Sequence, residues 1–180
     1  MMDTEEKYKV VIIDDERSAS DALRRELEPY REFEIKGIAS SGAKGKKMIM
    51  ELHPDLLFLD VEMPGMTGIE MADALRKIDP WVCISFVTSY DAFAIQAFRL
   101  DALDYVMKPI KYTQVKHIIE KAKIQIDYRK NAQKAEKRYL KIKSGYEDVA
   151  DLTGKMVELV GISIPIGVTE SGVSTFDVLA

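Results

Sequence analysis

Short apolar runs alternate with amphipathic segments from the start of the chain to about residue 126. Five of these runs have the length and composition of β-strands, at residues 8–13, 33–39, 56–59, 82–88 and 105–107. The first and third of them are almost continuously apolar, which is typical of strands buried on both faces of a parallel sheet.

The segments between and after these runs carry apolar residues at helical spacing. Helices are predicted over about 18–27, 41–53, from the turn at 63–65 to about 77, over 91–100, and from near 113 to about 126. In the last of these, Val115, Ile118, Ile119, Ala122 and Ile126 form one apolar stripe. A strand followed by a helix, repeated five times, predicts an α/β fold, a doubly wound parallel five-stranded sheet with helices on both faces.

Polar residues follow or end four of the predicted strands. Asp14 and Asp15 follow the first strand, Asp60 follows the third, Thr88 ends the fourth and Lys108 follows the fifth. Open parallel sheets carry their chemistry at the carboxyl ends of the strands, near a switch in strand order. We therefore expect these five side chains to converge on one edge of the sheet.

Each of these residues also has an ordinary structural explanation when it is taken alone. The Asp14-Asp15 pair could cap the following helix, and Asp60 could be a turn residue. Thr88 could simply end a strand as a β-branched residue, and Lys108 could be a solvated base. Their combination at the ends of successive parallel strands is much rarer than any one of them.

This combination of residue types is suited to binding a divalent cation and a phosphoryl group. Two carboxylates at ~4 Å repel by about 4 kcal/mol even at an effective dielectric of ~20. Mg²⁺ would relieve this repulsion, because it accepts carboxylates and keeps waters that phosphate oxygens can replace. Lys108 and the Thr88 hydroxyl can bind phosphate oxygens. Asp60 is then a candidate nucleophile toward a phosphoryl group.

Composition limits the class of protein. The 180 residues are 47% hydrophobic and 31% charged, which supports a packed core. One cysteine, Cys83, excludes an intrachain disulfide and a cysteine-rich zinc site. The first residues do not form a signal peptide, and the longest apolar runs are far short of the ~18 residues that span a bilayer. We expect a soluble, cytoplasmic protein without membrane contact.

The net charge of −4 hides three electrostatically different parts of the chain. Residues 1–110 carry a balance of −7, residues 111–143 a balance of +8, and residues 144–180 a balance of −5. The basic part is either a solvated helical extension or an arm that faces nucleic acid. The acidic tail is a poor candidate for gripping DNA.

Several motifs resemble the receiver domain of two-component response regulators over about residues 7–125. They are Asp14-Asp15-Glu16, the run Phe-Leu-Asp-Val-Glu-Met-Pro-Gly-Met-Thr-Gly at 58–68, Phe86-Val87-Thr88-Ser89, and Tyr105-Val106-Met107-Lys108-Pro109. The resemblance implies a flavodoxin-like (βα)5 fold. It also implies that the protein is no enzyme beyond its own phosphorylation and a slow autodephosphorylation.

The resemblance assigns a role to each residue of the motifs. Asp60 would be the phosphoacceptor. Asp14, Asp15, Asp60 and the backbone carbonyl of Glu62 would hold Mg²⁺. Thr88 would be the switch hydroxyl, Lys108 the phosphate-binding lysine, and Tyr105 the aromatic residue that turns inward on activation. A histidine kinase would be the partner that supplies the phosphoryl group, and phosphorylation would change output, with a phosphorylation-dependent homodimer as the expected assembly.

The segment 88–105 is similar to receivers attached to LytTR-type DNA-binding domains, which favours control of transcription.

The last third of the chain is less readily interpreted. We expect a receiver domain at 1–126, a basic helical linker at 127–138 and a short C-terminal β-like appendage at 139–180. Residues 139–145 resemble the opening strand of a LytTR domain, but the tail is about half as long as such a domain, so DNA binding by this chain is doubtful.

Two other functions stay open at this point. A metal-dependent phosphohydrolase also uses an aspartyl nucleophile, and Glu62 stands two residues after Asp60, where such enzymes usually have a second acid, although it fits that pattern only loosely. Their nucleophile follows the first strand, however, whereas Asp60 follows the third. A receiver could also act alone, only through contacts with other proteins.

Overall fold

A computed structural model describes residues 7–143, with side chains up to Tyr139. Strands and helices alternate along these residues. They are β1 (Tyr8–Ile13), α1 (Arg17–Leu27), β2 (Phe33–Ala39), α2 (Gly42–Leu52), β3 (Leu56–Leu59), α3 (Gly68–Ile78), β4 (Cys83–Thr88), α4 (Ala94–Arg99), β5 (Asp104–Met107) and α5 (Tyr112–Lys143).

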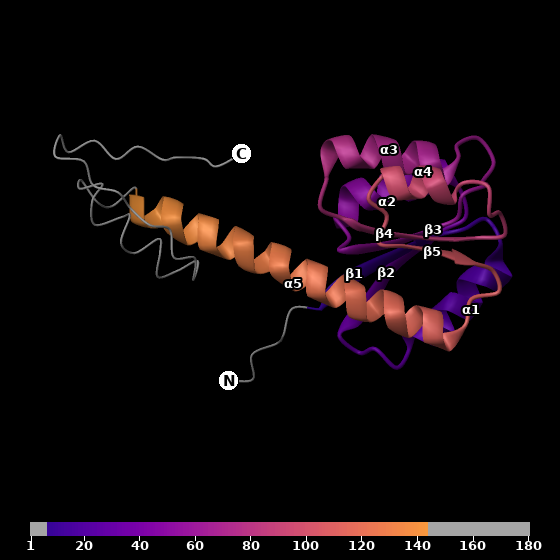
Figure 1. The fold of residues 1–180 in the computed structure, drawn as a ribbon, viewed down its shortest axis with the longest axis horizontal. Helices are drawn as coiled ribbons and strands as arrows, with labels where there is room; N and C mark the ends of the chain where they lie inside the picture. Colours follow the sequence, from indigo (N-terminus) through magenta and orange to yellow (C-terminus); the bar gives the residue numbers. More distant parts are fainter. Residues whose placement is uncertain (1–6, 144–180) are drawn as a thin grey trace. The chain divides into compact units, whose positions relative to one another are not determined.

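The strands form one parallel sheet in the order β2-β1-β3-β4-β5. The order reverses between β1 and β3, which is the switch point of a doubly wound sheet. Helices α1 and α5 cover one face of the sheet, and α2, α3 and α4 cover the other (Figure 1). The predicted α/β fold is confirmed.

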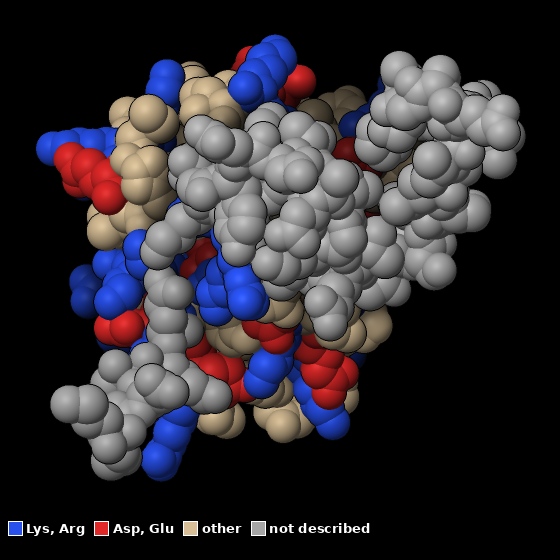
Figure 2. All heavy atoms as spheres, turned by 90° about the vertical axis from the view of Figure 1, so that its left-hand side faces the viewer, with Lys and Arg blue, Asp and Glu red and all other residues tan. Residues whose placement is uncertain are grey.

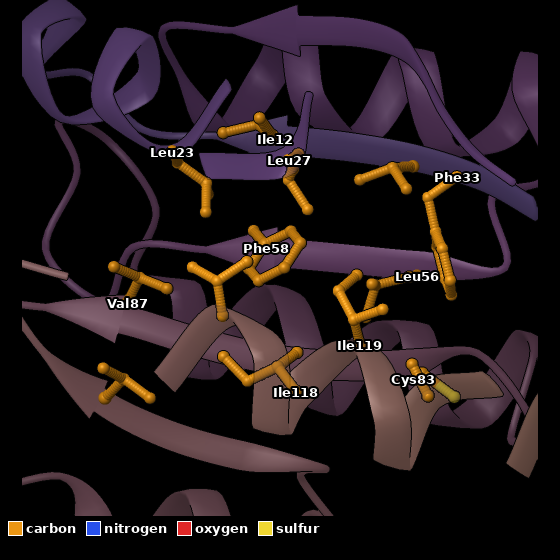
Figure 3. Packing of buried hydrophobic residues seen from close by; sticks show 14 of the residues in the cluster. Ile12, Leu23, Leu27, Phe33, Leu56, Phe58, Cys83, Val87, Ile118 and Ile119 are labelled. Carbon is orange, nitrogen blue, oxygen red and sulfur yellow. The ribbon is translucent and has the colours of Figure 1, made fainter. Parts of the chain in front are cut away.

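Side chains of the central strands pack into two separate cores, one on each face of the sheet, because successive residues of a strand point in opposite directions. Ile12 and Phe58 pack with Leu23 of α1 and Ile118 of α5 on one face (Figure 3). On the other face, side chains of the same strands pack against α2, α3 and α4, with Ile13 as one example. This double burial explains why the strands read as unbroken apolar runs.

Local capping explains where two of the helices begin. The Ser41 hydroxyl accepts a hydrogen bond from the Lys44 amide at the start of α2. Thr67 and Glu70 form a reciprocal capping box at the start of α3. The α4 helix begins at Ala94, three residues later than the sequence predicts, because the chain first makes a turn in which the Ala94 amide donates to the Asp91 carbonyl.

The α5 helix corrects the expected start of the C-terminal appendage. It runs without interruption to Lys143, so residues 139–143 are helical and not a strand. Leucine and lysine are good helix formers, and a helix that is already under way continues through them at little cost. Residues 127–138 are helical as expected, and the remainder of the appendage, 144–180, lies outside the described residues.

The chain divides into two compact units, 1–129 and 130–180. The first contains the whole sheet, α1 to α4 and most of α5. Of the second, the structure describes residues 130–143, which are helical. The role of 127–138 as a linker stays a prediction.

Charges of both signs are interspersed on the uncovered part of the face in Figure 2. Elsewhere along the helices, several exposed charges form pairs one helical turn apart, such as Lys47 with Glu51 and Lys116 with Glu120. Exposed pairs of this kind contribute little to stability. Among residues 7–143, no helix is both long enough and apolar enough to cross a bilayer.

Candidate functional site

The carboxyl ends of β1, β3, β4 and β5 bring together the polar residues that the sequence singles out. The strands are in register there, with Ile13 opposite Leu59 and Thr88 opposite Met107. Main-chain hydrogen bonds continue past the strand ends, from the Asp60 amide to the Ile13 carbonyl and from the Lys108 amide to the Thr88 carbonyl. Asp14, Asp60, Thr88 and Lys108 therefore sit on a rigid edge of the sheet.

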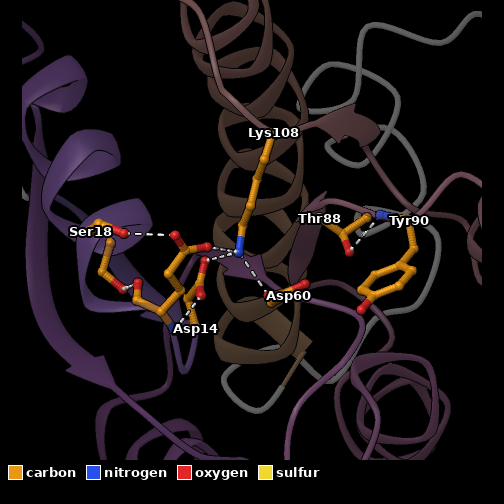
Figure 4. Close-up of polar contacts among 8 residues, drawn as sticks. Asp14, Ser18, Asp60, Thr88, Tyr90 and Lys108 are labelled. Atoms are coloured by element: carbon orange, nitrogen blue, oxygen red, sulfur yellow. Dashed lines mark hydrogen bonds and ion pairs between the residues drawn. The ribbon is translucent and has the colours of Figure 1, made fainter.

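Lys108 lies at the centre of the cluster. Its Nζ is 2.8 Å from Oδ2 of Asp14 and 2.8 Å from Oδ2 of Asp60, and it is 3.6 Å from Oε2 of Glu16 (Figure 4). Asp14, Asp60 and Lys108 are almost fully buried, whereas Glu16 is largely exposed. The ammonium group thus offsets the repulsion between two buried carboxylates.

Burial and hydrogen bonding act in opposite directions on Lys108. Burial alone would lower the pKa of this amine, because it disfavours the charged form. The hydrogen bonds from Lys108 to Asp14 and Asp60 outweigh burial and raise its pKa above the usual value. Lys108 therefore carries its positive charge throughout the physiological pH range.

The donor set fits a hard divalent cation. Asp14, Asp15 and Asp60 each offer a carboxylate oxygen, and these oxygens all lie within 4.8 Å of one another. Within residues 7–143, the Oδ1 atom of Asp60 is buried and finds no hydrogen-bond partner. A buried charged oxygen without a partner is costly, and a cation with oxygen ligands would satisfy it. Asp15 is exposed beside the buried pair and leaves the site open to solvent.

The cluster opens into a pocket of about 570 Å³. Its wall includes Asp15, Glu16, Asp60, Glu62 and Lys108, together with Ser89 from the segment after β4. A pocket of this size, with acidic and basic groups on one wall, has room for a phosphoryl group and its donor.

Thr88 and Tyr105 meet at the segment that follows β4. The buried Thr88 hydroxyl accepts a hydrogen bond from the Tyr90 amide at 3.4 Å. The Tyr105 hydroxyl donates to the Tyr90 carbonyl, and its ring centroid lies 6.0 Å from that of Phe86. Both predicted switch residues thus contact the same residue, Tyr90, from two different strands.

Two residues of the site were missed by the sequence analysis. Glu16 approaches Lys108 and also accepts a hydrogen bond from Ser18. The Tyr90 hydroxyl bonds to the Glu62 carboxylate, which raises the pKa of Tyr90. Their positions gave a signal, because Glu16 directly follows the acidic pair and Tyr90 stands two residues after Thr88.

Gly68 holds the Asp60 main chain at the start of α3. A Cβ atom at this position would lie 2.0 Å from the Asp60 carbonyl oxygen, so only glycine fits here. The Gly68 amide also donates to the Val61 carbonyl at 2.7 Å. This contact fixes the segment that carries Asp60 and Glu62.

Comparison with known proteins agrees with this fold and site. The model of the response regulator receiver domain family matches residues 10–120, so the chain belongs to that family. The sensory transduction protein LytT of Bacillus cereus is 38% identical over 117 residues, which cover 65% of this chain and 48% of that protein. The transcriptional regulatory protein BtsR of Escherichia coli is 41% identical over 103 residues, covering 57% and 42% of the two chains.

Solved receiver structures share the fold. The receiver domain of AraT, a response regulator from Geobacillus stearothermophilus, superposes with a TM-score of 0.64 at 27% identity, over 68% of this chain and 98% of that one. The response regulatory domain of mrkE from Klebsiella pneumoniae gives a TM-score of 0.63 at 27% identity, over 67% and 98%. The chain spans about half the length of the curated relatives that it matches.

The family places the chain in a known kind of signalling. Receiver domains of two-component systems interact with histidine kinases and generally bind Mg²⁺. The acidic cluster of this chain has the ligand types that such binding requires.

Proposed function

We propose that this chain accepts a phosphoryl group on Asp60 from a histidine kinase, with Mg²⁺ as its cofactor, and that phosphorylation alters its output surface. The observation that supports this most directly is the pairing of the buried Asp60 carboxylate with Lys108 at 2.8 Å. A nucleophile and a group that can neutralise a phosphate oxygen stand side by side at the wall of an open pocket.

The proposed transfer needs no further catalytic group from this chain. A carboxylate oxygen of Asp60 attacks the phosphorus of a phosphohistidine and forms an aspartyl phosphate. The bond between phosphorus and the imidazole nitrogen breaks, the nitrogen keeps the electron pair, and it takes a proton from solvent. Lys108 shifts from the Asp60 carboxylate to a phosphoryl oxygen, where it neutralises charge.

The acidic cluster would hold the cofactor. Asp14, Asp15, Asp60 and the backbone carbonyl of Glu62 are the proposed ligands, and the unpartnered Oδ1 of Asp60 supports this assignment. When bound, Mg²⁺ would supply charge neutralisation for the transferring phosphoryl oxygens. Asp14 also accepts a hydrogen bond from the Glu16 amide, which orients it within the site.

Thr88 and Tyr105 are the proposed switch. A new phosphate on Asp60 offers an acceptor to the Thr88 hydroxyl, which then leaves its contact with the Tyr90 amide. Because Tyr105 donates to the carbonyl of the same residue, both contacts bear on one segment. Its rearrangement would bias a two-state surface formed by α4, β5 and α5.

A phosphohydrolase is the second candidate, since Glu62 lies at the pocket two residues after Asp60. The two functions differ in the fate of the phosphoryl group. We would incubate the full chain with Mg²⁺ and acetyl phosphate and follow both the protein mass and the released phosphate. The proposal predicts a phosphorylated protein that persists and releases phosphate slowly. Rapid, repeated phosphate release without a phosphorylated protein would overturn it in favour of the hydrolase.

Control of transcription is the proposed output, as the names of the relatives suggest, with a phosphorylation-dependent homodimer as the active form. DNA binding by this chain itself is a separate question for the basic part of α5. A gel-shift titration with duplex DNA at two salt concentrations answers it, because phosphate contacts weaken steeply with salt. Binding that weakens with salt supports a nucleic-acid arm, and no binding at low salt leaves a solvated helix.

A further inference from the structure

The Arg76 side chain joins three parts of the fold. Its Nε donates to the Leu100 carbonyl at 2.8 Å, one terminal nitrogen to the carbonyls of Pro80 at 3.0 Å and Val82 at 2.6 Å, and the other to the Asp101 carbonyl at 3.0 Å. All four acceptors are main-chain oxygens. An arginine from α3 therefore binds the end of α4 and the segment that leads into β4.

The bonds to Leu100 and Asp101 complete the C-terminal cap of α4. Asp101 has a φ of 51°, in the left-handed region that residues with a side chain rarely adopt. Its amide donates to Phe98, and the next amide, of Ala102, donates back to Ala97, which is the Schellman arrangement of a helix end. Arg76 donates to the carbonyls of Leu100 and Asp101 at this same end of α4. The end of the helix is therefore held both by its own cap and by a side chain of α3.

At the opposite end of α4, the described residues provide no side-chain hydrogen bonds to the helix like those of Arg76. Phe93 precedes the first helical residue and makes no side-chain capping bond, and it lines the pocket beside Asp60. Ile95, in the first turn of the helix, is 70% exposed. Hydrogen bonds from Arg76 thus hold the C-terminal end of α4, whereas Phe93 holds the pocket end by packing against the core of that face, a contact without fixed hydrogen-bond geometry.

Helix α3 connects that fixed end to the phosphoacceptor. It starts at Gly68, which is packed against the Asp60 carbonyl, and Thr67 just before it lies at the pocket. Eight residues later in the same helix, Arg76 donates hydrogen bonds to the C-terminal end of α4. A single rigid helix thus runs from the Asp60 segment to the anchor of α4.

We propose that Arg76 is a positioning residue that fixes the C-terminal end of α4, so that events at Asp60 move the pocket end of α4 about this anchor. The phosphorylation part of this inference rests on the proposed function of Asp60, but the anchoring part does not. Without Arg76, α4 would open locally, and phosphorylation would no longer produce a defined change in it.

Hydrogen exchange measured by mass spectrometry on the full chain tests both parts. We would compare wild type with Arg76→Met, which keeps the length of the side chain but loses its donors, and with Arg76→Lys, which keeps the charge. The matched control is Lys77→Met on the same helix, because Lys77 is exposed and pairs only with Asp73 one turn earlier among the contacts described.

We expect amides of residues 94–103 to exchange at least about tenfold faster in Arg76→Met, because local opening is no longer opposed by the two hydrogen bonds to the Leu100 and Asp101 carbonyls. Arg76→Lys should be intermediate, and Lys77→Met should match wild type. Peptides covering β1 and β3 should keep wild-type protection in every variant. Equal exchange of α4 in Arg76→Met and Lys77→Met, or a uniform rise across all peptides, would overturn the anchoring role.

The second arm repeats the measurement after treatment with Mg²⁺ and acetyl phosphate. We expect Arg76→Met to gain the phosphoryl mass as wild type does, while the phosphorylation-dependent change in exchange at 94–103 falls to less than about half. A full wild-type change would overturn transmission through Arg76. If wild type itself gains no phosphoryl mass, the proposed function of Asp60 fails, and the anchoring result of the first arm still stands by itself.

Discussion

The ammonium group of Lys108 lies 2.8 Å from a carboxylate oxygen of Asp60, and both side chains are almost fully buried. The same ammonium group lies equally close to Asp14. Lys108 therefore offsets the repulsion between the buried carboxylates of Asp14 and Asp60, and it holds the Asp60 carboxylate at the wall of the pocket. Removing it should affect chemistry and stability together.

Replacement of Lys108 by methionine should slow phosphorylation of Asp60 by about 100-fold or more, because a charge that stabilises the transferring phosphoryl group is lost. The initial rate of mass gain with acetyl phosphate measures this. Lys111→Met, an exposed lysine three residues later, is the control and should react like wild type. An unchanged rate in Lys108→Met would contradict the assigned role.

Replacement of Gly68 by alanine should lower the free energy of unfolding by about 1–3 kcal/mol, because the added Cβ would overlap the Asp60 carbonyl. Chemical denaturation measures the effect. Gly65→Ala is a useful comparison, since no atom of the described residues lies within 4 Å of a Cβ placed there, and a φ of 88° is what opposes a side chain. Its cost should be smaller, about 1 kcal/mol. A Gly68→Ala protein as stable as wild type would show that the Asp60 segment shifts easily.

The pair formed by Arg129 and Asp55 ties α5 to the beginning of β3. Arg129 also donates to the Trp81 carbonyl at 3.1 Å, and only 13% of its side chain is exposed. Arg129→Met should cost about 3 kcal/mol, because it removes the arginine that pairs with a buried carboxylate. Lys123→Met, which removes an exposed pair with Glu32, should cost less than about 1 kcal/mol. Equal midpoints of denaturation for the two variants would refute the difference.

The thiol of Cys83 should be nearly inert in the folded protein. It is 2% exposed, and burial raises its pKa to about 11. At pH 8 its alkylation should be at least about 100-fold slower than in the denatured chain, because the thiolate is the reacting form. Iodoacetamide labelling followed by mass spectrometry gives both rates, and equal rates would contradict the burial of this residue.

The same pKa shift makes a prediction for stability against pH. The thiol is harder to ionise in the folded state, so its contribution to stability is complete below the unfolded pKa of about 9. It is lost as the pH rises from there toward 11, because the unfolded state releases the proton first. Cys83→Ala should lose less stability than wild type over this interval, and identical pH profiles would argue against the shift.

The arrangement of the sheet was accessible from the sequence for a physical reason. Strands buried on both faces cannot alternate polar and apolar residues, so runs such as Leu56 to Leu59 are conspicuous. The ends of parallel strands must lie on one edge, which is why Asp14, Asp60 and Lys108 could be expected to meet. What spacing alone did not provide was the partner of each atom, such as the approach of Glu16 to Lys108.

Two features of the structure were beyond the reach of local pattern. The alternation of apolar and basic residues from Tyr139 onward fits a strand, yet a helix continues through Lys143 because nothing before it stops the helix. The four bonds of Arg76 join residues up to 25 positions apart. Its place in an amphipathic helix gave no sign of them, since an arginine on a helix flank is usually solvated.

The central claim is that Asp60 carries the phosphoryl group, and the most direct measurement is the intact mass of the full chain after incubation with Mg²⁺ and acetyl phosphate. The comparison variants are Asp60→Asn and Asp55→Asn, which alter buried carboxylates just beyond either end of β3. We predict a gain of one phosphoryl group in wild type and in Asp55→Asn, absent in Asp60→Asn and absent when a chelator removes Mg²⁺. A phosphorylated Asp60→Asn protein, or a wild type that never gains this mass, would contradict the account.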